Sequence, residues 1–598
     1  PRSTLFPYTT LFRSFRLGFL HMKKKLLPAL IVTGLIILVV IIMGITALIN
    51  KYTPTKKTED LKEYFNISSD DEAALIVDNE LSDYKAKIID KKIYVDYKFV
   101  HDSLNSRFYW DANENVLLYT TASDIISAAA DSNSYSVTKQ TNDFGYPIVK
   151  ATSDSALIAL DYVKQYSNIT FKSYDDPARI VITSKWDEID SATVSKSTQV
   201  RVKGGIKSPI LKEVKKDDKI TILDSGDKWD KVATEDGVIG YIKSKALSES
   251  KKTKLTNPDY EEETFTHIKK DKDICLAWNQ VTSQSANSKV PQVISSTKGI
   301  NVMSPTWFYL NDNNGNLADI ASKDYVSYCH SQGIEVWGLF SNLENTDVDA
   351  AYVLTHTSTR TTLINQIMSA AFNYELDGVN IDFENITEAA YGDSYIEFIR
   401  ELAIKCHNNG ISLSVDVTVP ASFNKFFNRS DMANFADYIV IMGYDEHYKG
   451  SDAGSVSSIP WVTEGVESTL KEVPADQIIL GMPFYTRIWE LTPKEDDDAV
   501  TDTEDQSKYT VASQVYSMDA AAAQLATNNA TAALDEESGQ NYAEWSVSNK
   551  LYKVWLEDST SLEKRLKLVD DNKLAGAAFW KLGFENSSVW DTVIKYLD

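Results

Sequence analysis

One short apolar segment carries polar side chains of the types and spacing that a catalytic site needs. The segment DGVNIDFE (377–384) holds Asp377, Asn380, Asp382 and Glu384, and we expect all four around one strand end. Asn380, Asp382 and Glu384 stand at i, i+2 and i+4, so they share one face of a β-strand. Burying carboxylates at this density is costly unless they do chemistry. The segment therefore indicates a functional site.

Thiol and metal chemistry are not indicated. The three cysteines, Cys275, Cys329 and Cys406, are widely spaced, and there is no CxxC pair or Cys/His ligand spacing. We interpret them as small buried residues and not as paired or catalytic thiols. The seven histidines include no His-x-x-x-His pair. The sequence therefore predicts neither a metal site nor a cofactor.

The segment must be positioned by the elements around it, and these repeat as short apolar runs separated by helical stretches. The runs begin at Ile274, Gly299, Ile334, Leu376, Ile411, Tyr438, Ile478 and Gly576. Eight strands alternating with helices predict a parallel (β/α)₈ TIM barrel over 273–598, with its active site at the carboxyl ends of the strands. The stretch from Thr486 to Asp570 exceeds one loop and helix, so we expect an insertion that lines one wall of the cleft.

At this point the sequence resembles a known family. DGVNIDFE is similar to the DGxDxDxE signature of glycoside hydrolase family 18, which includes chitinases and peptidoglycan N-acetylglucosaminidases of spore-forming bacteria. Segments with counterparts in the branch related to spore-cortex enzymes are SPTWF at Ser304, MGYD at Met442, GMPFYTRIW at Gly481 and FWKLGFEN at Phe579. Asn380 replaces the middle aspartate of chitinases, as it often does in the spore-cortex branch. This departure weakens chitin as a substrate more than it weakens hydrolysis.

The resemblance implies a retaining, substrate-assisted hydrolysis in which the acetamido oxygen of the substrate is the nucleophile. It assigns Glu384 as general acid and then general base, with a pKa raised by Asp382 and by partial desolvation. Asp382 would accept a hydrogen bond from the acetamido N–H, and Tyr444 would hydrogen-bond the acetamido group. The implied substrate-binding residues are Asn380, Asp445, Met442, Trp580, Trp307 and Tyr485.

Two of these binding residues have a more specific expectation. Asp445 would position Tyr444 or bind sugar hydroxyls, and Trp580 would form an apolar floor under the reacting sugar. For Trp307, as for the three other tryptophans expected at strand ends, a sugar platform and buried packing both fit; those three are Trp278, Trp337 and Trp489.

The segments before the barrel have no catalytic spacing. Residues 1–21 are interpreted as non-native sequence, because a methionine, a basic run and an apolar run follow them in the order of a bacterial anchor. Residues 22–50 are predicted to be a transmembrane anchor. Within them Leu26 to Ile49 carries no charge, and a helix of that length crosses a hydrocarbon core of about 30 Å.

Two further modules are expected between the anchor and the barrel. Residues 61–190 repeat weakly with an offset of 63 residues, and we predict tandem small α+β modules similar to stalk modules of bacterial envelope proteins. Residues 197–249 have short strands split by turns and resemble a bacterial SH3 domain through Arg201, Trp229 and the GYI segment at Gly240. A wall-binding role and an inert spacer role both fit these modules.

The charge balance limits the classes of molecule that this protein binds. With 61 basic and 85 acidic residues the net charge is −24, which argues against nucleic acid. The sequence thus predicts a multidomain, single-pass protein of the cell membrane. Its extracytoplasmic barrel would cleave a cell-wall glycan, either peptidoglycan or a chitin-type oligosaccharide. The alternatives are a lectin-like barrel that binds glycan without cutting it, and a chitinase; the presence of Glu384 and Tyr444 favours hydrolysis.

Overall fold

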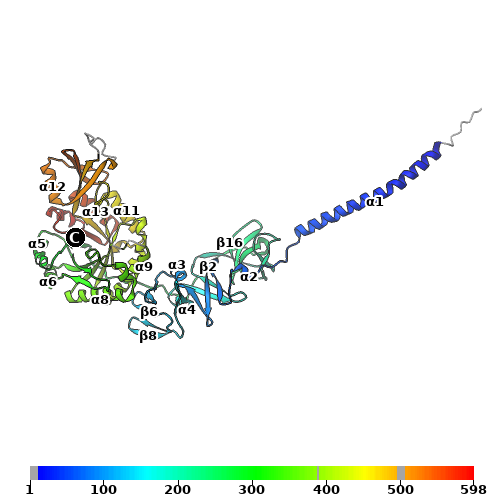
Figure 1. The fold of residues 1–598 in the computed structure, drawn as a ribbon, viewed down its shortest axis with the longest axis horizontal. Helices are drawn as coiled ribbons and strands as arrows, with labels where there is room; N and C mark the ends of the chain where they lie inside the picture. Colours follow the sequence, from blue (N-terminus) through cyan, green and yellow to red (C-terminus); the bar gives the residue numbers. More distant parts are fainter. Residues whose placement is uncertain (1–10, 385, 387–388, 495–505, 598) are drawn as a thin grey trace, which may run out of the picture. The chain divides into compact units, whose positions relative to one another are not determined.

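The structure, a computed structural model, describes residues 11–384, 386, 389–494 and 506–597 (Figure 1). Contacts between Cα atoms divide the chain into two compact units. The first unit contains residues 1–94 and 166–260, and the second contains residues 95–165 and 261–598. Each unit is therefore built from two segments that are distant in the sequence, and the stretch predicted as tandem modules (61–190) contributes to both.

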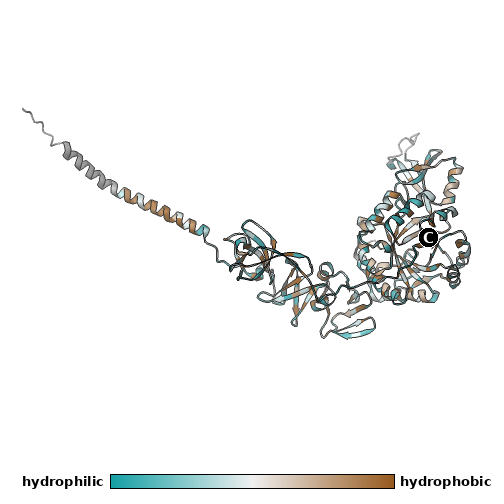
Figure 2. Ribbon diagram, turned by 180° about the vertical axis from the view of Figure 1, so that it is seen from behind, coloured by the Kyte–Doolittle hydropathy of each residue, from teal (hydrophilic) through white to brown (hydrophobic). Residues whose placement is uncertain are grey.

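The first unit begins with a long helix, α1 (Leu11–Tyr52). From Pro28 to Tyr52 this helix is long and apolar enough to cross a membrane, by length and composition alone. Figure 2 shows the hydrophobic residues that follow one another along it. This part overlaps the span expected from Leu26 to Ile49.

Two β-sheets and the short helix α2 (Leu61–Tyr64) form the rest of the first unit. In one sheet five strands lie side by side in the order β11, β12, β1, β2 and β3. Their bounds are β1 (Glu72–Val77), β2 (Glu80–Ile89), β3 (Lys92–Asp96), β11 (Thr170–Tyr174) and β12 (Arg179–Thr183). The β1–β12 pair is parallel, and the β1–β2, β2–β3 and β11–β12 pairs are antiparallel.

The other sheet of this unit contains the short strands expected between 197 and 249. Its strand order is β15-β14-β18-β17-β16-β13-β19, and its pairs are antiparallel. The bounds are β13 (Glu188–Thr193), β14 (Thr198–Arg201), β15 (Ile210–Val214), β16 (Lys219–Asp224), β17 (Trp229–Thr234), β18 (Ile239–Lys243) and β19 (Lys251–Lys254).

The second unit opens with a small α+β segment. Strands β4 to β8 form an antiparallel sheet in sequence order, β9 pairs with β10, and two short helices accompany them. The bounds are α3 (Tyr97–Ser103), β4 (Phe108–Asp111), β5 (Val116–Thr120), β6 (Ile125–Ala129), β7 (Ser134–Val137), β8 (Gln140–Asp143), β9 (Val149–Ala151), β10 (Ala156–Ala159) and α4 (Leu160–Gln165).

The rest of the second unit is the predicted barrel, and all the predicted strands are present. Eight parallel strands follow the order β20-β33-β27-β26-β25-β24-β23-β21, and pairing of β20 with β21 closes the ring. The bounds are β20 (Ile274–Asn279), β21 (Val302–Leu310), β23 (Glu335–Ser341), β24 (Gly378–Asp382), β25 (Ser412–Thr418), β26 (Tyr438–Met442), β27 (Ile478–Pro483) and β33 (Gly576–Trp580). The short β22 (Leu317–Asp319) extends this sheet beside β21.

Helices alternate with these strands, as the βα pattern predicts. They are α5 (Val290–Ile294), α6 (Lys323–Ser331), α7 (Ala350–Thr355), α8 (Thr357–Tyr374), α9 (Ala389–His407), α10 (Arg429–Phe435), α11 (Ile459–Thr469), α13 (Ser559–Asn572) and α14 (Trp590–Val593). Apolar residues between strands and helices form the main core, which includes all three cysteines. The expectation that the cysteines are buried free thiols is therefore confirmed, and burial raises the pKa of Cys275 to about 12.

The insertion expected after the seventh strand is confirmed as a second small sheet. It is antiparallel, with the order β29-β28-β32-β31-β30, and it carries one helix. The bounds are β28 (Tyr485–Pro493), β29 (Tyr509–Ser517), α12 (Met518–Thr527), β30 (Ala533–Asp535), β31 (Gln540–Val547) and β32 (Lys550–Leu556). Because β28 follows β27 at once, its first residues lie at the carboxyl end of the barrel.

Candidate active site

Strand β24 carries the polar residues of the DGVNIDFE segment into the barrel. Its apolar residues Val379 and Ile381 belong to the core between strands and helices. Side chains alternate along a strand, so Asn380 and Asp382 point into the barrel. Both are buried, and Glu384 follows just beyond the end of the strand, where it is exposed. The predicted grouping of these three residues is therefore present.

Asp377 lies at the opposite end of the same strand. One carboxylate oxygen accepts a hydrogen bond from the backbone N–H of Val336 at 2.8 Å, and Nε2 of His330 lies 2.8 Å from the same oxygen. These partners stand at the start of β23 and in the last turn of α6. The expectation that Asp377 joins the other three polar residues is wrong, because a strand of five residues separates its two ends by well over 10 Å.

The amide of Asn380 has a fixed orientation. Its Oδ1 accepts hydrogen bonds from the indole Nε1 of Trp278 at 3.0 Å and from the hydroxyl of Ser304 at 2.9 Å. Its Nδ2 donates to Asp416 Oδ1 at 2.7 Å and to Ser414 Oγ at 3.0 Å. The side chain therefore connects strands β20, β21, β24 and β25 inside the barrel, and it presents its N–H groups toward β25.

Buried carboxyl groups gather at the ends of β24 and β25. Asp382 is 9% exposed and Asp416 is 3% exposed. Burial raises the pKa of Asp382 well above its ordinary value, and the charges of Asp416, Glu384 and Glu344 raise it further. Burial also raises the pKa of Asp416, although the hydrogen bond from Asn380 opposes this rise. One oxygen of Asp382, Oδ1, has no hydrogen-bond partner among the described residues.

Glu384 is placed to exchange a proton with a ligand. Desolvation raises the pKa of its carboxyl group, and the negative charges of Asp445 and Glu344 add to the rise. Its backbone N–H donates to Asn342 Oδ1 at 3.1 Å, which fixes the chain after β23 against the chain after β24. A carboxyl group with a raised pKa at the mouth of a barrel has the property that a general acid needs near neutral pH.

Aromatic side chains form an apolar surface beside these carboxyl groups. The ring of Trp278 meets those of Trp580 and Tyr444 edge to face, at centroid distances of 5.9 Å and 6.4 Å. Tyr444 in turn lies 6.3 Å from Tyr485. Trp580 and Tyr444 are only partly buried, so they are available to a sugar ring, whereas Trp278 is enclosed.

Two residues of the insertion contact Asp445. The hydroxyl of Tyr485 donates to Asp445 Oδ1 at 2.6 Å, and the guanidinium of Arg487 lies 3.7 Å from the same oxygen. Both residues belong to β28, so this strand of the insertion contributes to the site. Asp445 itself is exposed, with its carboxylate available to sugar hydroxyls.

A small pocket of about 150 Å³ adjoins Glu384. Met442 and Asp416 line it together with aromatic side chains from the segment after β25. One of these, Phe423, is 77% exposed. Met442 therefore lines the same pocket as Glu384.

Trp307 lies away from these residues, in the core between strands and helices. It is fully buried, its indole nitrogen donates to Asn287 Oδ1 at 2.8 Å, and its ring packs on Tyr325 at 4.9 Å. Of the two interpretations open for Trp307, the structure therefore supports buried packing, because no face of the ring is free to meet a sugar.

Sequence reasoning missed several residues that the structure brings to the site. Asp416 is the most informative, because a single carboxylate in the apolar run ISLSVDVTV has the same inward parity as Ser414. Reading that run with a period of two would have identified it. The positions of Glu344 and Asn342, in the loop after β23, have no such signal.

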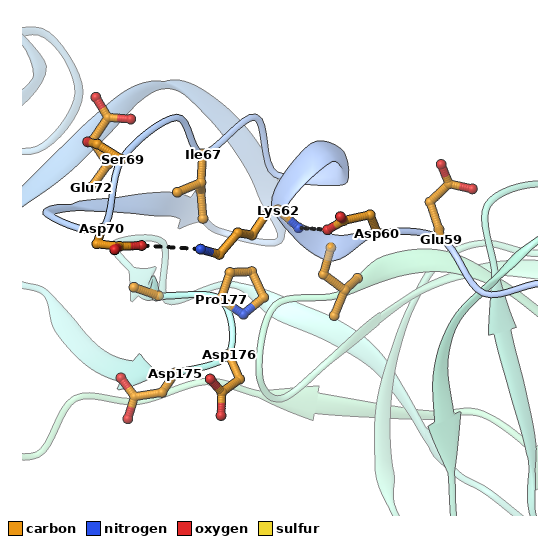
Figure 3. Close-up of a pocket in the computed structure, with 12 residues that line it drawn as sticks. Glu59, Asp60, Lys62, Ile67, Ser69, Asp70, Glu72, Asp175, Asp176 and Pro177 are labelled. Atoms are coloured by element: carbon orange, nitrogen blue, oxygen red, sulfur yellow. Dashed lines mark hydrogen bonds and ion pairs between the residues drawn. The ribbon is translucent and has the colours of Figure 1, made fainter.

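One pocket of the first unit has a different electrostatic character (Figure 3). It has a volume of about 700 Å³, and half of its lining residues are acidic, with Lys62 paired to Asp70 at 3.2 Å. Hydrogen bonds from Ser68 and Lys87 lower the pKa of Glu72 to about 2. The carboxylate of Glu72 is therefore ionised at neutral pH, whereas burial raises the pKa of Asp382 and Asp416 inside the barrel.

Comparisons with known proteins agree with the geometry of the barrel. Residues 339–585 match the family model described as glycosyl hydrolases family 18. Among curated proteins, the glycosylase YvbX of Bacillus subtilis is 24% identical over 48% of this chain and 81% of its own length. The cortical fragment-lytic enzyme of B. subtilis is 24% identical over 46% of this chain and 63% of its own length. The sporulation-specific glycosylase YdhD of B. subtilis is 26% identical over 38% of this chain and 52% of its own length.

Proposed function

Because the chain belongs to glycoside hydrolase family 18 through residues 339–585, we propose that this glycosidase cleaves glycans that contain N-acetylglucosamine, and that bacterial peptidoglycan is its substrate. The observation that carries the proposal is the carboxyl group of Glu384, which has a raised pKa and stands beside Asp382 at the carboxyl end of the barrel. The names of the relatives, cortical fragment-lytic enzyme and sporulation-specific glycosylase, support a bacterial cell-wall glycan over chitin.

The proposed reaction is substrate-assisted and retains the anomeric configuration. Glu384 gives its proton to the leaving oxygen, and the acetamido oxygen of the substrate attacks the anomeric carbon from the opposite face. Asp382 accepts a hydrogen bond from the acetamido N–H and stabilises the positive charge of the ring that forms. Tyr444 binds the acetamido group, and Glu384 then takes a proton from the attacking water.

The remaining predicted residues complete the site. Trp580 forms the floor under the reacting sugar, because its ring is partly exposed and supported by Trp278. Asp445 binds sugar hydroxyls, and the buried Tyr485 contributes to substrate binding from the insertion by holding the Asp445 carboxylate. Met442 contacts the sugar next to Glu384, with which it lines a pocket. Trp307 is left out, since it is enclosed in the core.

The segments before the barrel are proposed to hold the enzyme near its substrate. The apolar part of α1 serves as a single membrane anchor with the barrel on the extracytoplasmic side. The sheet from β13 to β19 is an SH3-like module and the α+β segments are stalk-like modules, both serving wall binding or spacing. Among their described residues, nothing combines buried carboxyl groups in the way that the barrel does.

Digestion of purified glycans tests the proposed substrate. The protein is incubated with purified peptidoglycan and, separately, with chitin oligomers, and mass analysis identifies the new reducing ends. Peptidoglycan fragments that end in N-acetylglucosamine are expected. Cleavage of chitin oligomers alone would identify a chitinase instead. Binding of glycan without any new reducing end would identify a lectin-like barrel.

A modified substrate tests the mechanism. A substrate whose acetamido group is replaced by a hydroxyl should not be cleaved, because it lacks the nucleophile. A thiazoline that mimics the cyclic intermediate should bind far more tightly than the substrate does. Efficient hydrolysis of the modified substrate, or a glycosyl ester trapped on a carboxylate, would refute substrate assistance.

A further inference from the structure

Asp416 stands directly beside Asp382 in the barrel. Strands β24 and β25 are parallel neighbours, with Asn380 opposite Ser414 and Ile381 opposite Val415. The next step of this register brings Asp382 and Asp416 together. Val415 and Val417 pack outward in the core, so Asp416 points inward, as Asp382 does. Neighbouring strands lie about 4.8 Å apart, so the two carboxyl groups are within reach of each other.

No cation compensates this pair. Among the described residues, no lysine, arginine or histidine forms an ion pair with Asp382, Asp416 or Glu384. The other titratable groups that act on the pair are Glu384, Glu344, Tyr395 and Tyr444, which are acidic or neutral. Two buried carboxylates at this separation cannot both be ionised at neutral pH without a large cost, so the pair keeps one proton.

The hydrogen bond from Asn380 decides where this proton rests. Nδ2 of Asn380 donates to Asp416 Oδ1 at 2.7 Å, and the opposite side of the amide is fixed by Trp278 and Ser304. An N–H donor stabilises the ionised form of the carboxyl group that it contacts. In the free protein, therefore, the negative charge lies on Asp416 and the proton lies on Asp382.

We propose that Asp416 is a positioning residue that shares one proton with Asp382 and takes it over when the substrate arrives. The inference rests on the proposed function, in which Asp382 must be a carboxylate to accept the acetamido N–H. The O–H bond of Asp382 breaks, an O–H bond of Asp416 forms, and the negative charge moves from Asp416 to Asp382. The pair keeps one proton and one negative charge throughout, so no proton enters from or leaves to solvent, and the negative charge stands on Asp382 only when the substrate is bound.

A proton count tests the sharing without any need for activity. In the E384Q background, which removes the proton of Glu384, unfolding near pH 6 should release about one proton from the Asp382 and Asp416 pair, since both are ionised in the unfolded chain. The double variant E384Q/D416N should release about one proton fewer. The D416N substitution keeps a side-chain oxygen that can accept from Asn380, so the variant retains this hydrogen bond. The triple variant E384Q/N380D/D416N, which returns a carboxyl group next to Asp382, should release the proton again.

The pH profile tests the role in the reaction. In D416N the new amide accepts from Asn380 through its oxygen and donates an N–H to Asp382, which stabilises the ionised form of Asp382 already in the free enzyme. The negative charge of Asp382 then lies next to Glu384 and raises the pKa of that residue. The alkaline limb of kcat/KM, which reports the free enzyme, should therefore move to higher pH by about half a unit to one unit, and N380D should reverse the shift. If Asp416 had only a structural role, the alkaline limb of kcat/KM would stay at the same pH in D416N.

The outcomes separate the two proposals. An equal proton count with and without Asp416, or an unmoved alkaline limb in an active D416N enzyme, overturns the role of Asp416. A wild-type protein that cleaves no glycan containing N-acetylglucosamine overturns the proposed function. In that case the proton count still decides whether the two carboxyl groups share a proton.

Discussion

Two groups of carboxyl groups in the barrel unit differ in whether arginines accompany them. The first is the group at the ends of β24 and β25, which contains Asp382, Asp416 and Glu384 and has no described cation partner. The second lies on α9, outside the ring of strands, and includes Glu397 and Glu401. We call the first the catalytic cluster, after the role proposed for it, and the second the helix cluster.

Each acidic residue of the helix cluster accepts a hydrogen bond from an arginine. Nε of Arg360 donates to Glu401 at 2.9 Å, and Arg400 donates to Glu397 at 3.0 Å and also bonds Asp431. Burial raises the pKa of Glu401, and the guanidinium of Arg360 opposes that rise.

The α+β segment of residues 95–165 closes this cluster from outside. The hydroxyl of Thr120 donates to Glu397 Oε1 at 2.8 Å. The ring of Tyr109 lies under the guanidinium of Arg360 at 5.1 Å, and its hydroxyl lies 3.0 Å from Ser394 Oγ. These contacts are polar and fully enclosed, so the segment is a structural part of the barrel unit.

The difference shows what a missing cation does. A buried carboxyl group that is paired with an arginine holds elements together, and removal of its partner is costly. A buried carboxyl group without a cation keeps a proton at a pH where an ordinary carboxyl group has lost it, and so it can donate that proton. Asp382 and Asp416 are buried, as Glu397 and Glu401 are, so the arginines are the main difference between these two pairs.

The largest expected effect comes from E384Q in the catalytic cluster. Glutamine keeps the shape of the side chain but cannot donate a proton, so turnover should fall by about 10²- to 10⁴-fold while glycan binding persists. Steady-state kinetics and equilibrium binding to the same glycan measure the two properties. Near-normal turnover of E384Q would show that Glu384 is not the proton donor.

The same substitution in the helix cluster should have the opposite consequence. E401Q leaves the fully buried Arg360 without its carboxylate, and breaking a buried ion pair in this way costs roughly 3–5 kcal/mol of unfolding free energy. Turnover per folded molecule should stay within about twofold of the wild type, because Glu401 does not face the site. Denaturant unfolding of the barrel, together with the kinetics used for E384Q, checks both expectations. A loss of turnover without a loss of stability would break the comparison.

The barrel could be predicted from the sequence because each strand is a short apolar run bounded by helical stretches. The catalytic cluster was found in part for a related reason, since DGVNIDFE combines acidic residues with a period of two. Asp416 was missed because it is the only acidic residue of its strand. Its proposed role depends on Asp382, which lies on the neighbouring strand.

The helix cluster, and the segment of residues 95–165 that covers it, could not be predicted in this way. Glu397, Arg400 and Glu401 read as ordinary polar residues of an amphipathic helix, and Thr120 reads as a strand residue. Their burial depends on how a segment more than 200 residues earlier packs on α9, and no local pattern encodes that contact. Trp307 illustrates the same limit, because its type fits a sugar platform but its neighbours enclose it.

A smaller effect on stability is expected in the segment of residues 95–165, which covers the helix cluster. T120V preserves the size of the side chain but removes the hydroxyl that donates to the buried Glu397, which should cost about 1–3 kcal/mol of unfolding free energy. T141V changes an exposed threonine of the same small sheet and serves as the control, with an expected change below about 0.5 kcal/mol. Equal stabilities of T120V and T141V would mean that residues 95–165 do not contribute to holding the cluster.

The smallest effect should come from E344Q, which removes one negative charge near the catalytic cluster without touching the residues assigned to the reaction. Glu344 is exposed, and its charge raises the pKa of Glu384. Without that charge the pKa of Glu384 falls, so the protonated acid is lost earlier and the alkaline limb of kcat/KM moves to lower pH, by about 0.3 to 0.5 units. This direction is opposite to the shift expected for D416N.

Because Glu344 is exposed, the shift should shrink between about 0.05 M and 0.5 M salt. The exposed Glu536 in the insertion provides the control E536Q, and a limb that moves equally in both variants would mean that net charge, and not the position of Glu344, sets the pKa of Glu384.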